Sequence, residues 1–213
     1  MKLKTLQVLV VVCVTYIAAQ IFADITSLRI LFIGGLSIDG GTLVYPFTFT
    51  LRDMVHKVAG ASIARTLIIT AAVINLLMAG LFWLISVLPP DMSVGAQAEF
   101  GIVLAPVLRI VLASIIAEVV SELIDTEMYE LWIKWIGHNK QWGRVLFSNA
   151  ISVPIDSALF VVIAFLGNLP VDVVFSIFIA NVLVKGAVTF ISIPGIYLIK
   201  DQPKGWLEDV ESE

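Results

Sequence analysis

Long apolar runs separated by short polar stretches occupy most of the chain, from residue 5 to residue 199. A helix needs about 20 apolar residues to cross the roughly 30 Å hydrocarbon core of a bilayer. Arg65 and Asp91 bracket 25 uncharged residues, which predicts a clear membrane span. The whole pattern predicts an all-α membrane protein: one domain, residues 1–199, with six transmembrane helices at about 5–24, 41–58, 66–88, 101–125, 145–167 and 171–199, and a polar cytoplasmic tail at 200–213.

The first apolar run has features of a signal peptide as well as of a span. Lys2 and Lys4 precede it, and Phe22-Ala23 imitates a cleavage site. We expect the run to be retained as the first span, because apolar runs continue along the chain as far as Leu198.

Residues 25–58 do not fit a simple span. Glycine pairs at 34–35 and 40–41 interrupt the segment, so we expect an extended or re-entrant excursion at 28–39. The 12 uncharged residues at 40–51 would cover about 18 Å as a helix, too little to cross the membrane alone. Arg52 and Asp53 must therefore lie within protein, in a wet cavity or at the lipid headgroups.

Composition supports lipid as the solvent. Hydrophobic residues make up 59% of the 213 residues and charged residues only 14%, whereas soluble domains have about 45–50% and about 25%. This composition excludes a cytosolic enzyme, a nucleic-acid binder and a disordered chain. The net charge of −4 gives no reason to expect a phosphate backbone as partner. The single cysteine, Cys13, can form neither an intrachain disulfide nor a zinc cluster.

The distribution of Lys and Arg predicts the orientation. With the N-terminus inside, 10 of the 13 basic residues fall on the cytoplasmic side and only Arg29 falls outside. Arg109 and Lys185 lie within predicted spans. Because basic residues favour the cytoplasmic side of membrane proteins, we expect both termini in the cytoplasm.

Three ionisable residues lie near the middle of predicted spans. They are Glu118, Asp156 and Lys185, in the fourth, fifth and sixth spans. A charge at this depth costs at least about 2.5–3.5 kcal/mol and therefore faces a partner, a cavity or a substrate. Two acids and one base leave a formal charge of −1, so we expect a proton, a cation or a donor-rich ligand beside them.

Polar residues continue these positions as stripes at helical spacing. The stripes are Ser114, Glu118, Ser121, Glu122 and Asp125; Asn149, Ser152 and Asp156; and Asn181 and Lys185. Three stripes at one depth predict a polar pocket between helices. The alternative is a structural Asp156–Lys185 ion pair that only fixes helix packing. Arg109, on roughly the opposite helix face from Glu118, is expected to pair with an outer acid or line an entrance.

Catalytic and cofactor motifs are absent from the sequence. It has neither a GxxxxGK[ST] phosphate-binding loop nor an HExxH zinc motif, and its two histidines are far apart. Gly35-Leu36-Ser37 is the nearest approach to a serine protease motif, but no histidine lies at mid-span. We therefore expect a transport or binding function without a cofactor, with an intramembrane enzyme as the weaker hypothesis.

Four motifs occur in the order and spacing of a known family. They are YPFTFTLRD at 45–53 with Gly60 and Ala64-Arg65; Arg109 with Ala113-Ser114 and SELID at 121–125; VPIDSALF at 153–160 with IAF at 163–165; and Lys185 with Pro194 and Tyr197. Over about residues 45–197 the chain resembles the queuosine precursor transporter family. It departs from that family's pattern at Tyr45, Glu122 and Pro154, and at Gln20 in the first span.

The resemblance implies a multi-pass carrier of bacterial inner membranes, with a six-helix fold similar to the substrate-binding subunits of energy-coupling-factor importers. It implies a secondary transporter that imports a queuosine precursor base, 7-cyano- or 7-aminomethyl-7-deazaguanine. Its partners would be this purine-like small molecule and the lipid bilayer, and nucleic acid would not be a partner. The resemblance leaves open whether the chain forms a homodimer. The alternative function is a substrate-binding subunit of an ATP-driven vitamin-type importer.

The stripes and the motifs together give the candidate substrate-binding residues. They are Glu118, Asp156, Lys185, Asn181, Asp53, Asn149, Gln20, Arg109 and Glu122. A buried carboxylate, Glu118 or Asp156, can accept both donors on the edge of a guanine-like base. Lys185 or Asn181 can donate to its O6 or to a cyano nitrogen. The positive charge of the aminomethyl form would offset the formal −1.

Overall fold

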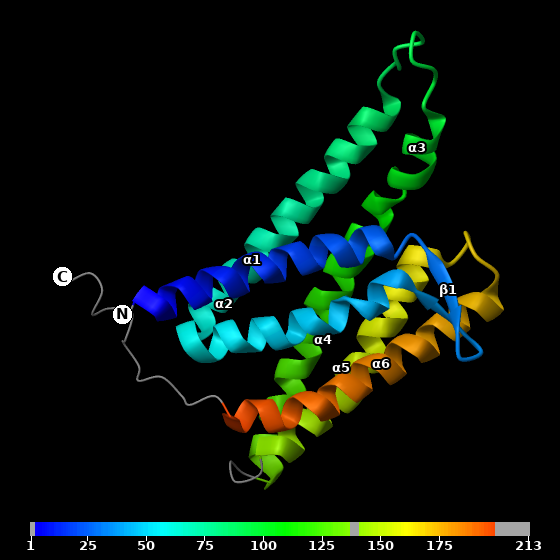
Figure 1. The fold of residues 1–213 in the computed structure, drawn as a ribbon. Helices are drawn as coiled ribbons and strands as arrows, with labels where there is room; N and C mark the ends of the chain where they lie inside the picture. The colour runs from blue at the N-terminus through cyan, green and yellow to red at the C-terminus, as the bar shows by residue number, and fades with distance from the viewer. Residues whose placement is uncertain (1–2, 137–140, 199–213) are drawn as a thin grey trace.

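The computed structural model describes residues 3–136 and 141–198, and it is a bundle of long helices with one small β-hairpin (Figure 1). The elements are α1 (Leu3–Thr26), β1 (Ile30–Ile33), β2 (Leu36–Asp39), the 3₁₀ helix η1 (Gly40–Leu43), α2 (Tyr45–Val87), α3 (Ala98–Leu104), α4 (Val107–Ile136), α5 (Gln141–Phe165) and α6 (Val171–Leu198).

Five helical segments of the described chain are long and apolar enough to cross a membrane. They are Leu6–Thr26, Ser62–Val87, Ala98–Ser121, Leu146–Phe165 and Val171–Ile191. The chain is therefore a helical membrane protein. The predicted span at 41–58 is not among these five, so the count of six is not confirmed. Its short uncharged stretch, followed by Arg52 and Asp53, accounts for the difference.

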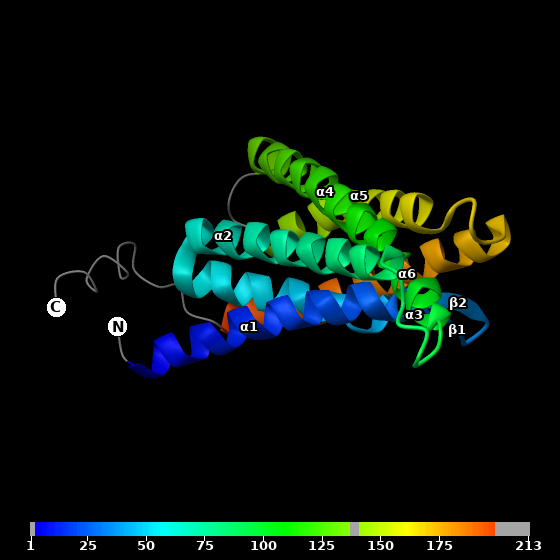
Figure 2. The same ribbon diagram turned by 90° about the horizontal axis from the view of Figure 1, so that it is seen from above.

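The predicted second and third spans form one kinked helix, α2, in the structure. Gly60 has φ 85° and ψ 171°, a conformation outside the helical region that only glycine adopts at little cost. The kink turns the chain back on itself, so the two arms of α2 run in opposite directions and diverge in Figure 1. Seen from above, the arms lie one beside the other (Figure 2).

Residues 28–39 were predicted to form an extended or a re-entrant excursion. In the structure they contain an extended segment, a two-stranded antiparallel hairpin. Residues pair from Ile30 with Asp39 to Ile33 with Leu36. The two-residue turn consists of Gly34 and Gly35, with φ 62° and 86°, as the favoured hairpin turn with two positive φ angles requires. This hairpin is a small departure from the predicted all-α class. It brings β2 and η1 against the helices.

Two further glycines allow η1 to pack closely on the end of α1. A Cβ atom on Gly41 would lie 2.0 Å from Ser27 Oγ and 2.6 Å from the carbonyl oxygen of Ala23. A Cβ atom on Gly40 would lie 2.4 Å from the carbonyl oxygen of Thr26. Only glycine fits at these two positions, and the close approach holds Asp39 and Thr42 beside α1.

Buried hydrophobic side chains, several of them alanines, fill the contacts between helices. One buried cluster joins α4, α5 and α6 and consists of Ile110, Ala113, Val161, Ala164, Phe165, Val174 and Ile177. Another joins α1 to both arms of α2 and consists of Tyr16, Val55, Ala59, Ala64, Leu67 and Ala71. Alanines at such contacts let helix backbones approach closely, as is usual in membrane proteins.

Candidate functional site

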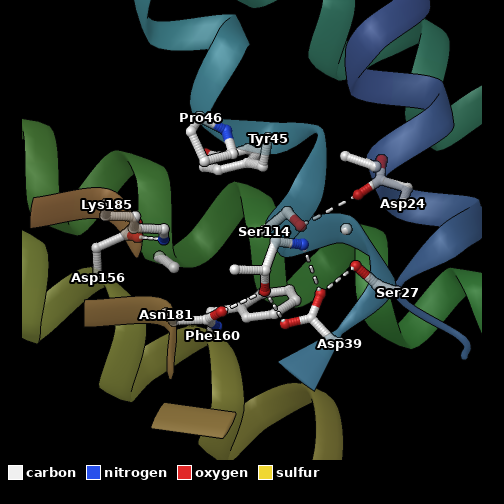
Figure 3. Close-up of a pocket in the computed structure, with 14 residues that line it drawn as sticks. Asp24, Ser27, Asp39, Tyr45, Pro46, Ser114, Asp156, Phe160, Asn181 and Lys185 are labelled. Atoms are coloured by element: carbon white, nitrogen blue, oxygen red, sulfur yellow. Dashed lines mark hydrogen bonds and ion pairs between the residues drawn. The ribbon is translucent and has the colours of Figure 1, made fainter. Parts of the chain in front are cut away.

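A cavity lined by polar, aromatic and small side chains lies where α1, the end of β2, η1, the start of α2, α4, α5 and α6 meet (Figure 3). The empty space between its walls is about 430 Å³ when the open space at its mouth is included. The lining residues are Ala23, Asp24, Ser27, Asp39, Gly41, Thr42, Tyr45, Pro46, Ser114, Ala117, Asp156, Phe160, Asn181 and Lys185. Three aspartates and one lysine give this lining a formal charge of −2.

One wall of the cavity holds an ion pair between α5 and α6. Lys185 Nζ donates to Asp156 Oδ2, and both side chains are buried. Ser121 Oγ lies 3.3 Å from Asp156 Oδ1 and 3.1 Å from the Glu118 carbonyl oxygen, so its single hydroxyl proton is shared between these two acceptors. Lys185 Nζ lies 5.0 Å from the centroid of the Tyr45 ring, a favourable cation–π contact. Each charge thus offsets the desolvation of the other.

The opposite wall holds Asp39, whose carboxylate is fully hydrogen-bonded. Asp39 Oδ1 accepts from Ser27 Oγ at 2.9 Å and from the Thr42 backbone N–H at 3.2 Å. Asp39 Oδ2 accepts from Thr42 Oγ1 at 2.6 Å. The side chain is 1% exposed and caps η1. Thr42 Oγ1 also contacts the Asn181 side chain, which connects this wall to α6.

A third acid, Asp24 near the end of α1, is much less well paired. Its side chain is only 3% exposed. Asp24 Oδ1 accepts one hydrogen bond, from Ser114 Oγ at 3.2 Å. Asp24 Oδ2 is buried and makes no hydrogen bond with any residue that the structure describes.

Aromatic rings complete the lining. Tyr45, on α2, packs edge to face on Phe49 with ring centroids 5.1 Å apart. Phe160, on α5, makes the same kind of contact with Phe165 at 5.7 Å. In Figure 3 Tyr45 lies above and Phe160 below the space between the acidic walls. Two aromatic rings, together with polar side chains that are held in place by hydrogen bonds, suit the binding of a planar, polar ligand.

Three of the predicted site residues line this cavity: Asp156, Lys185 and Asn181. Glu118 does not line it, although its neighbour Ala117 does. The side chains of Asp53 and Glu122 lie outside the part of the chain whose side chains are described. The structure thus brings together the mid-span residues of α5 and α6, with Asn181 one turn away.

The other three predicted residues bind elsewhere. Gln20 Nε2 donates to Tyr16 Oη at 3.1 Å within α1. Asn149 Nδ2 lies 3.4 Å from Thr189 Oγ1, between α5 and α6. Arg109 on α4 donates from Nε to the Ile163 carbonyl and from Nη2 to the Leu166 carbonyl, each at 2.6 Å.

These contacts explain why Arg109 is not at the cavity. The last carbonyl groups of a helix have no partners within it, and a cation there is favourable. Arg109 satisfies the carbonyls at the end of α5 instead of an outer acid.

Sequence reasoning named Asp24 only as a polar residue able to line the cavity, and it assigned no function to Ser27, Asp39, Thr42 or Tyr45. One signal was available for Asp39, because it directly precedes the glycine pair that the close approach to α1 requires. For Asp24 the sequence offered no signal beyond its polarity at the end of an apolar run.

Comparisons with known proteins agree with the motifs. A family model described as "Putative vitamin uptake transporter" matches residues 39–199. A protein of Bacillus subtilis (strain 168) named "Probable queuosine precursor transporter" is 27% identical over 187 residues, covering 85% of this chain and 80% of the relative. No solved structure matches the chain significantly. The resemblance derived from the motifs is thereby confirmed.

Proposed function

The chain belongs to the family described as "Putative vitamin uptake transporter", and from that premise we propose that it imports a queuosine precursor base, 7-cyano- or 7-aminomethyl-7-deazaguanine. The observation that carries the proposal is the cavity with acids on two sides, one lysine, one asparagine and two aromatic rings. The name of the B. subtilis relative supports the choice of substrate.

The chemistry of the base fits the lining groups. The guanine-like edge presents N1–H and an exocyclic amine side by side, which suit a carboxylate. Lys185 and Asn181 can donate to O6 or to a cyano nitrogen from the other wall. The aminomethyl form carries a positive charge, and the formal −2 of the lining favours a cation.

The proposal includes a route across the bacterial inner membrane as a secondary transporter. The sixth crossing would be the first arm of α2, which lies between α1 and α6 in Figure 1. The fold would then be similar to the substrate-binding subunits of energy-coupling-factor importers. Both termini would lie in the cytoplasm, because the basic residues Arg65 and Lys134 would then face inward.

Uptake of labelled precursor tests the function, in cells that cannot make the base. We expect wild-type protein to restore uptake. Asp156→Asn and Lys185→Met should each lower the uptake rate at least about 10-fold, since each leaves a buried charge or donor unpaired. The matched controls are Asp172→Asn and Lys134→Met, which alter exposed residues of the same types. Wild-type protein that reaches the membrane without importing the base would refute the proposal.

The vitamin-type importer is a second candidate, because the family description names vitamin uptake. In that case the chain would need ATPase and coupling subunits. Uptake by the purified single chain in liposomes supports the secondary transporter. Copurification with two ATPases and no uptake by the chain alone would support the importer subunit instead.

A further inference from the structure

We infer that Asp24 is the carboxylate that receives the paired N–H donors of the ligand, while Asp156 and Asp39 serve the protein itself. This inference rests on the proposed function, because it takes the ligand to be a planar base with an N–H group next to an exocyclic amine. It assigns a binding role to a residue that precedes the region matched by the family model, 39–199.

The inference follows from comparing the three carboxylates that line the cavity. Asp39 accepts three hydrogen bonds from Ser27 and Thr42, and both of its oxygens are engaged. Asp156 is engaged by the Lys185 ammonium on Oδ2 and by Ser121 on Oδ1. Asp24 has only the Ser114 hydroxyl on Oδ1, and its Oδ2 makes no hydrogen bond within the described residues.

Burial makes this difference significant. A polar group removed from water costs free energy unless a partner replaces its hydration, and an ionised group costs more. Asp24 is 3% exposed, so water at the surface cannot compensate its second oxygen. Its placement in the cavity lining leaves that compensation to an occupant of the cavity.

The position of Asp24 also defines how a ligand would lie. In Figure 3 Asp24 and the Lys185–Asp156 pair are on opposite sides of the cavity, with Tyr45 and Phe160 above and below the space between them. A flat base with its donor edge toward Asp24 would direct its acceptor atoms toward Lys185 and Asn181. The carboxylate would then form two parallel N–H···O bonds, the strongest arrangement for such a donor pair.

A pair of ligands isolates this contact. The ligands are 7-cyano-7-deazaguanine and the analogue that lacks the exocyclic amine, with affinity for the purified protein measured by ligand-induced melting shifts. We expect wild-type protein to bind the amine-bearing base about 10- to 100-fold more tightly, as for hydrogen bonds to charged groups. In Asp24→Asn this preference should fall to about 3-fold or less, because the acceptor pair is gone.

Two further variants separate Asp24 from Asp156. Asp156→Asn should weaken both ligands by a similar factor and keep the preference for the amine. Asp172→Asn, an exposed carboxylate on α6, should change neither affinity. If Asp24→Asn fails to fold, the Asp156→Asn variant still tests the inference. Loss of the preference for the amine-bearing base in Asp156→Asn would overturn the inference.

The stability of the empty protein distinguishes binding from structure. Removing a poorly paired buried carboxylate should leave the melting temperature of ligand-free Asp24→Asn unchanged or raised. A clear fall in that temperature with an intact amine preference would make Asp24 structural and overturn the inference. Failure of the wild-type protein to bind either base refutes the proposed function instead, so the two failures are distinguishable.

Discussion

The Asp39 wall and the Asp156–Lys185 wall hold their charges in different ways. Asp39 takes its three donors from Ser27 and Thr42, within 12 residues along the chain. Asp156 depends on Lys185, 29 residues away on another helix. The first arrangement is built by a local turn and its two glycines, whereas the second exists only while α5 and α6 stay in contact. The Asp39 wall therefore depends on the local backbone, and the Asp156–Lys185 wall depends on the packing of two helices.

Breaking the Asp156–Lys185 ion pair should have the largest effect on stability. Lys185→Met leaves Asp156 buried without its cation, and the expected loss is about 3–5 kcal/mol in the free energy of unfolding. The double variant Lys185→Met with Asp156→Leu removes both charges and should recover most of that loss. Chemical denaturation in detergent measures both. A double variant no more stable than Lys185→Met would show that the pair does more than neutralise charge.

Substitution of Gly41, which lets η1 and the Asp39 wall pack on α1, should have a smaller effect on stability. Gly41→Ala places a methyl group 2.0 Å from Ser27 Oγ and 2.6 Å from the Ala23 carbonyl oxygen, so η1 must move away from α1. We expect a loss of about 1–3 kcal/mol, as for other overpacked contacts. Gly80→Ala is the matched control, because nothing lies within 4 Å of a Cβ atom there. Equal loss in both variants would contradict the close packing of η1.

The smallest effects should come from the two serines, one on each wall. Ser27→Ala removes a 2.9 Å hydrogen bond to Asp39, and Ser121→Ala removes a 3.3 Å hydrogen bond to Asp156. We expect losses of about 1–2 kcal/mol and about 0.5 kcal/mol respectively, because longer hydrogen bonds contribute less. Melting temperatures of the two variants, measured side by side, check the order. The reverse order would mean that Asp156 relies on Ser121 more than its geometry indicates.

Much of the helical architecture and part of the site could be predicted from the sequence. Asp156 is the only charged residue between Arg144 and Asp172, and Lys185 is the only one between Asp172 and Lys200. A single charge inside so long an apolar run needs a partner in the bundle. The sequence therefore offered an Asp156–Lys185 ion pair as one interpretation of these charges, and the structure contains that pair.

The parts of the site and of the fold that could not be predicted depend on how the chain folds back on itself. Asp24 and Asp39 lie at the ends of apolar runs, where an acid is ordinarily solvated. The fold buries both, with Asp24 beside Ser114 of α4 and Asp39 beside Ser27 at the end of α1. Gly60 likewise gave no sign that two predicted spans form one kinked helix. These features follow from contacts between segments that sequence periodicity does not record.

The contacts of Arg109 with the end of α5 have a consequence for any motion that admits a solute. They join the first turn of α4 to the end of α5, so these two helices are held to each other. Separating them would expose a guanidinium group and two carbonyls to hydrocarbon. The Asp156–Lys185 ion pair likewise holds α6 to α5, so a gate is easiest to open along the contacts that α1 and α2 make with these helices.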